Sequence, residues 1–126
     1  MKFVRDPGSA VTVRHVQEGM IKIGNEELTE NVVLFRNSIQ RGWQAKDIEN
    51  PDVHDLTDLL AENPEMIIFG TGWQSRLPPR ELVFALARRG IGFEMMDTPA
   101  ACRTFNVLVS EDRDVAAVLI ISSQKQ

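Results

Sequence analysis

The first third of the chain alternates hydrophobic and polar residues with a period of two, which is the pattern of half-buried strands. Residues 11–14 show this alternation, and residues 20–23 repeat it after the turn signal Glu18-Gly19. Residues 32–35 are a continuous apolar run, which favours a strand covered on both faces. The pattern predicts an N-terminal antiparallel β-hairpin followed by a buried strand.

The rest of the chain alternates short apolar runs with segments of helical periodicity. Helices are predicted near residues 52–63, 78–90 and 97–109, and strands at residues 66–69, 91–95 and 115–121. Asp52 is a competent N-cap, Asn63-Pro64 is a helix stop, and Gly90 is expected in left-handed geometry after a helix. Residues 36–51 show no clear pattern, although Trp43 is expected to anchor them to the core.

This order of elements predicts an α/β domain in which helices cover a central sheet. The strand–helix–strand unit between residues 66 and 95 should be parallel. The N-terminal hairpin is expected to add an antiparallel part, so that the sheet as a whole is mixed. We expect one domain over residues 1–126, with residues 1–10 as a loosely held lead-in and residues 122–126 as a polar tail.

Composition narrows the classes of function. The net charge of −4 and the pI near 5.2 argue against a nucleic-acid binder, which needs a basic surface. One cysteine cannot form an internal disulfide, and together with only two histidines it argues against a metal site, so no metal or cofactor is expected. No apolar run approaches the roughly 20 residues of a transmembrane segment, and the N-terminus carries no recognisable leader. These features predict a cytoplasmic location.

The turn Gly70-Thr71-Gly72 follows a predicted buried strand, at the end of a sheet where open α/β folds tend to hold ligands. Its backbone N–H groups could cradle an anion. Glycine is equally what a tight strand-to-helix turn requires for steric reasons, and the turn matches no complete phosphate-loop motif. Trp73 follows directly, and an exposed tryptophan beside a glycine turn is a candidate interface anchor.

A second candidate segment runs from Asp97 to Asn106 and also links a strand to a helix. Asp97 is expected to cap that helix rather than to act as a base. Cys102 could be a nucleophile near a helix N-terminus, but no histidine lies nearby in the sequence, and a small buried hydrophobe is the simpler interpretation. Arg103 is either a solvated surface residue or, alternatively, an anion clamp or an interface arginine.

Residues 67–72 (IIFGTG) and 96–108 (MDTPAACRTFNVL) together resemble the Mth-like domain family of proteins of unknown function. That family includes the mitochondrial respiratory complex I assembly factor three and an adipogenesis-associated Mth-domain protein. The resemblance implies a three-layer α/β fold and no established catalytic residues. By similarity it marks a candidate functional surface: Gly70, Thr71, Gly72, Asp97, Thr98, Cys102, Arg103 and Asn106. Phe105 stands where relatives often carry tyrosine, and with no targeting leader a role in complex I assembly does not carry over.

The sequence therefore predicts a non-enzymatic accessory or assembly-type protein that binds a protein partner through the surface of the Gly70 and Asp97 turns. The alternative is a small anionic ligand bound at the same surface, with the Arg103 guanidinium assisting the backbone donors. Both interpretations require that two turns almost thirty residues apart in the sequence emerge side by side.

Overall fold

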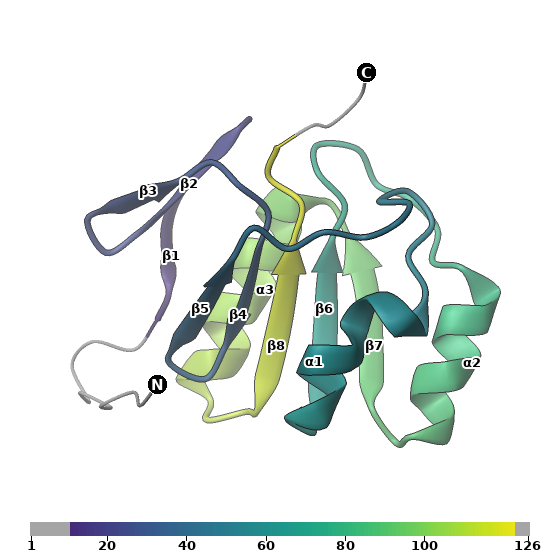
Figure 1. Ribbon diagram of the computed structural model, residues 1–126. Coiled ribbons are helices and arrows are strands. Elements are labelled where there is room, and N and C mark those ends of the chain that lie inside the picture. Colours follow the sequence, from purple (N-terminus) through teal and green to yellow (C-terminus); the bar gives the residue numbers. More distant parts are fainter. Residues whose placement is uncertain (1–10, 123–126) are drawn as a thin grey trace.

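Two β-sheets of different size and four helical segments make up the computed structural model, which describes residues 11–122 (Figure 1). The small sheet contains β1 (Val13–Gln17), β2 (Met20–Ile23) and β3 (Glu26–Leu28). The central sheet contains β4 (Val32–Phe35), β5 (Ser38–Arg41), β6 (Met66–Gly70), β7 (Gly92–Met96) and β8 (Val115–Leu119). The helical segments are η1 (Val53–Leu56), α1 (Thr57–Ala61), α2 (Arg80–Arg88) and α3 (Thr98–Ser110). The expected lead-in, and the polar tail beyond residue 122, lie outside the described residues.

The central sheet is mixed, as predicted, with strand order β5-β4-β8-β6-β7. β6 runs parallel to both β7 and β8, whereas β4 runs antiparallel to β5 and β8. The N-terminal hairpin was expected to form part of this sheet, and that expectation was wrong. β1 pairs with β2, and β2 pairs with β3, in a separate sheet. The apolar side chains of that small sheet pack against a face of the central sheet, so its strands do not extend the central sheet's edge.

The fold has three layers, as the resemblance implied (Figure 1). The small sheet and α3 cover one face of the central sheet, and η1, α1 and α2 cover the other. Successive residues of the central strands point to opposite faces: Ile68 packs toward α3, while Ile67 and Phe69 pack toward α1 and α2. Burial on both faces explains why β6 and β8 are continuous apolar runs.

Capping and stop residues in the sequence predicted the helix boundaries well. Asp52 accepts a hydrogen bond from the backbone N–H of His54 and forms a capping box with Asp55, although a 3₁₀ turn precedes the short α-helix. Asn63 ends that segment with φ of 59°, and Gly90 follows α2 with φ of 74°. α2 itself begins at Arg80, two residues later than predicted, because the Pro79 backbone is extended.

Two strands escaped prediction, and both are at edges. β3 lies at an edge of the small sheet and β5 at an edge of the central sheet, where a strand needs few apolar residues. The segment after β5 returns to the core at Trp43, as expected. The Trp43 ring meets the Phe69 ring edge-on, with 5.7 Å between centroids, and its indole N–H donates to the Asp55 carbonyl over 3.2 Å.

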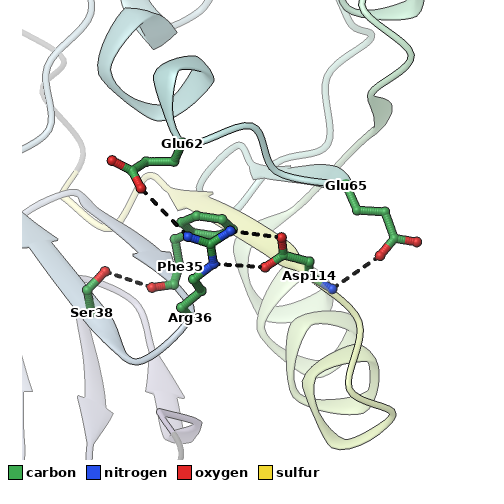
Figure 2. A network of polar contacts seen from close by, with 6 residues as sticks. All are labelled: Phe35, Arg36, Ser38, Glu62, Glu65 and Asp114. Atoms are coloured by element: carbon green, nitrogen blue, oxygen red, sulfur yellow. Dashed lines mark hydrogen bonds and ion pairs between the residues drawn. The ribbon is translucent and has the colours of Figure 1, made fainter. Parts of the chain in front are cut away.

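A polar network closes the end of the central sheet where β6 and β8 begin (Figure 2). The Arg36 guanidinium lies 4.4 Å from the centroid of the Phe35 ring and donates two hydrogen bonds to the Asp114 carboxylate, at 3.2 and 3.1 Å. It also pairs with Glu62 at 3.7 Å, and the Asp114 backbone N–H donates to Glu65 over 3.2 Å. The network joins the β4–β5 turn to the segments that lead into β6 and β8.

Candidate functional site

The Gly70 and Asp97 turns lie side by side. They follow the neighbouring parallel strands β6 and β7, in which Gly70 pairs with Met96. The Thr71 N–H donates to the Met96 carbonyl over 2.8 Å, and the Thr98 N–H donates to the Gly72 carbonyl over 2.7 Å. The structure thus brings together two segments that the sequence separates, at the carboxyl ends of two central strands (Figure 1).

The Thr98 hydroxyl is the polar centre of this junction and is fully buried. It accepts a hydrogen bond from the Gly72 N–H over 2.8 Å and donates one to the Ile120 carbonyl over 2.7 Å. The Ile120 N–H in turn donates to the Gly70 carbonyl over 2.9 Å. One side chain therefore links the glycine turn, the start of α3 and the segment after β8.

Both glycines have steric reasons to be glycine. A Cβ on Gly70 would lie 2.9 Å from Thr98 Oγ1, 3.0 Å from Thr98 Cα and 3.1 Å from Ala101 Cβ, so a side chain would push α3 away from β6. Gly72 has φ of 92°, which other residues rarely adopt. The steric interpretation of this turn is sufficient to explain its composition.

The backbone donors expected for an anion are already used inside the protein. The N–H groups of Thr71, Gly72 and Thr98 make the hydrogen bonds given above, and the Ala100 N–H donates to the Asp97 carboxylate over 2.8 Å. Asp97 is therefore the N-cap of α3, as predicted. The N–H groups of Thr71 and Gly72, which the anion interpretation required, are therefore not free, because packing of α3 onto β6 turns them toward internal acceptors.

The α3 residues of the predicted site point in different directions. Cys102 is buried, and burial raises the pKa of its thiol to about 12, with a smaller opposing effect of Arg103. Asn106 accepts from the Val13 N–H and donates to the Val13 carbonyl, both at 2.9 Å, and so attaches β1 to α3. Arg103 is exposed and makes no hydrogen bond or ion pair with any described residue. These three residues do not join the two turns in one site.

A wide, open cleft of about 1020 Å³ lies beside the glycine turn. Of the predicted site residues, Thr71, Gly72 and Trp73 line it, and Gly70, Asp97 and the α3 residues do not. Trp73 is half-buried at its wall. The other walls come from segments that the sequence did not mark as part of a site: residues 18–19, 29–31, 42–49 and 120–122. Trp43 lies in one of these segments, and the sequence predicted it as a core anchor.

Acidic residues outnumber basic ones around the cleft. Its charged residues are Glu18, Glu30, Asp47, Glu49, Lys46 and Arg76. Arg76 and Glu49 form an ion pair at 3.2 Å, which joins the segment after the glycine turn to the segment after Trp43. The local charge therefore favours a basic group over an anion as the occupant of this cleft.

The structure offers no metal centre and no membrane-spanning helix within the part of the chain that it describes. Across residues 11–122, no three side chains of the His, Cys, Asp and Glu types gather closely enough to hold a metal ion. None of the helices in the same range combines the length and the apolar composition needed to cross a bilayer.

Comparison with curated proteins adds two kinds of relative. The chain is 43% identical over 107 residues to the NADH dehydrogenase [ubiquinone] 1 alpha subcomplex assembly factor 3 of Xenopus tropicalis, covering 82% of this chain and 56% of that protein. It is 39% identical over 74 residues to a 13 kDa major membrane protein of Francisella tularensis, covering 59% of this chain and 60% of the relative. The match thus spans less than two thirds of each of these relatives.

Solved structures and the family comparison agree with the fold. A Xanthomonas campestris protein solved by NMR superposes with a TM-score of 0.83 at 28% identity, covering 98% of this chain and 93% of that one. A Bordetella pertussis structure described as a Mth938-like domain gives 0.76 at 26% identity, covering 98% and 96%. Residues 13–120 match the family described as protein of unknown function (DUF498/DUF598). The chain therefore belongs to this Mth938-like family.

Proposed function

We propose that this chain is a non-enzymatic accessory or assembly-type protein that binds a protein partner through the surface beside the Gly70 and Asp97 turns. The observation that carries the proposal is the position of Trp73. The joined turns hold it, half-buried, at the wall of the wide cleft. Tryptophan supplies a large contact area at little entropic cost and is enriched among residues that dominate binding.

The shape and charge of the cleft support a polypeptide as occupant. Pockets for small molecules bury most of the surface of their ligand, whereas this cleft is only partly enclosed. Its excess of carboxylates favours a partner segment that carries lysine or arginine, and works against the small anionic ligand. We therefore expect a basic segment of the partner to lie against Trp73.

The family background supports an assembly-type role. It includes proteins named as assembly factors for NADH dehydrogenase as well as proteins of unknown function. Burial of Cys102 and the raised pKa of its thiol argue against a role as the nucleophile that the sequence offered. A cytoplasmic location remains a prediction from the sequence, because a relative is named a membrane protein.

Site-specific photo-crosslinking tests the proposal. We would replace Trp73 by p-benzoylphenylalanine in the full chain, irradiate intact cells, and identify adducts by mass spectrometry. A matched variant carries the same group at Val107, which is 55% exposed on α3 and lies outside the cleft. We expect a discrete protein adduct from position 73 and none from position 107.

The same adducts from both positions, or none from position 73, would contradict the proposal. A thermal-shift titration with inorganic phosphate examines the anionic alternative. A rise in Tm that is lost in Lys46→Ala would favour it, since Lys46 is the cationic cleft residue without an ion pair among the described residues.

A further inference from the structure

The outer face of α2 combines an exposed aromatic ring with free positive charge. Leu82 and Leu86 point into the core, and on the opposite side Arg80, Phe84 and Arg88 are all exposed. Residues four apart are neighbours on a helix surface, so Phe84 lies between the two arginines. Its side chain is 53% exposed.

A second exposed apolar side chain belongs to the segment that leads into α2. Leu77 lies three residues before Arg80 and is 91% exposed. The length of the intervening chain keeps its Cα within about 11 Å of the Arg80 Cα. Three large hydrophobic residues are exposed among residues 11–122, and two of them, Leu77 and Phe84, belong to this segment.

The charge of the segment is opposite to that of the whole chain. Residues 76–89 contain four arginines and one glutamate, whereas the chain carries a net charge of −4. Arg76 is paired with Glu49, but Arg80, Arg88 and Arg89 make no ion pair with any residue in the described part of the chain. Uncompensated arginines around an exposed phenylalanine are typical of a binding surface.

We propose that this α2 face, defined by Leu77, Arg80, Phe84 and Arg88, docks an acidic amphipathic helix of a partner protein. The apolar stripe of such a helix would cover Leu77 and Phe84, and its flanking carboxylates would pair with Arg80 and Arg88. The inference goes beyond the proposed function, because the α2 face lies outside the acidic cleft and selects the opposite charge.

Two other occupants fit the surface less well. In a symmetric dimer built on this face the same arginines would meet across the axis, and like charges would repel. A membrane surface needs a broad apolar face, but Leu82 and Leu86 of α2 are committed to the core. An acidic helix needs only the two exposed side chains and the arginines beside them.

The test uses two synthetic helical peptides with the same leucine stripe, one with glutamates and one with lysines at the flanking positions. Binding to the full chain is followed by fluorescence anisotropy. We expect the glutamate peptide alone to bind, with affinity that falls as salt rises. Phe84→Ser, and separately Arg80→Glu with Arg88→Glu, should weaken binding at least about tenfold, while Val107→Ser, an exposed change on α3, should not.

Because the substituted residues are exposed, we expect the thermal unfolding of these variants to match the wild type. Equal binding of both peptides, failure of the glutamate peptide to bind, or full binding by the charge-reversed variant would overturn the proposal. Sedimentation of the chain with phosphatidylglycerol vesicles in an α2-dependent manner would point to a membrane instead. An α2-dependent dimer in analytical ultracentrifugation would point to self-association.

Discussion

The residues of the Gly70 and Asp97 turns contribute above all to the stability of the fold. Thr98 is a polar residue without exposure, yet both hydrogen-bonding capacities of its hydroxyl are used, by the Gly72 N–H and the Ile120 carbonyl. A buried polar group that is fully paired costs little and fixes the geometry of its neighbours. Thr98 thereby sets the position from which Trp73 reaches the cleft.

Gly70→Ala should destabilise the fold by about 1–3 kcal/mol. The added Cβ would come within 2.9–3.1 Å of Thr98 and Ala101, and backbone atoms of α3 would have to move. The measurement is urea denaturation followed by circular dichroism. Gly92→Ala is the matched control, since its Cβ would meet nothing closer than 3.5 Å. Equal loss of stability in both variants would show that the close approach at Gly70 is not the cause.

At the scale of elements, α3 holds the molecule's two sheets together. Its buried residues Ala101, Cys102 and Phe105 pack on the central sheet, and Asn106 makes two hydrogen bonds to the β1 residue Val13. The small sheet therefore docks through a side-chain amide as well as through apolar contact. Asn106 therefore has a structural role, whereas the family resemblance had marked it only as a candidate site residue.

Asn106→Leu should loosen the small sheet from α3. The change leaves the N–H and the carbonyl of Val13 without their partner, at a cost of about 1–3 kcal/mol. Hydrogen exchange should accelerate for β1 amides while those of β6 and β8 stay protected. Arg103→Leu, an exposed change on the same helix, is the control and should leave both rates unaltered. Uniform acceleration in all strands would argue against local undocking.

For the whole molecule, the two ends of the central sheet have different roles. One end holds the glycine turn and the open cleft, and the other is closed by the Arg36–Asp114 network (Figure 2). In that network the pKa of Glu65 lies below its ordinary value of 4.5, chiefly through its hydrogen bond with Arg113 and then through the Asp114 N–H. Charge pairing joins separate segments at that end, whereas the other end presents Trp73 and the cleft.

Glu65→Gln should reduce the acid sensitivity of the fold. Since the pKa of Glu65 is depressed in the folded protein, its ionised form stabilises the fold above pH 4.5, and this contribution is lost as pH falls through the lower folded pKa. The wild type should therefore lose more stability than the variant over that window, in urea midpoints measured against pH. Parallel midpoint curves for the two proteins would exclude a contribution of Glu65.

Much of the fold could be predicted from sequence because its signals are local. Apolar runs marked β4, β6 and β8, and Asp52, Gly90 and Asp97 marked helix ends. β3 and β5 were not predicted, because edge strands bury little and carry few apolar residues. The small sheet was misassigned to the central one, since local periodicity does not say which surface an apolar face will cover.

The sequence by itself determined the order of elements and the two turns that follow β6 and β7. Only the tertiary structure decided what those turns can offer. The Gly72 N–H is bound by an internal acceptor, Thr98 Oγ1. Cys102 is buried, and Asn106 bonds to the Val13 backbone. Trp73 is half-exposed beside a cleft lined by residues that are distant in the sequence. The physical reason is range: caps and periodicity act over a few residues, whereas hydrogen-bond partners and exposure depend on segments far apart in the chain.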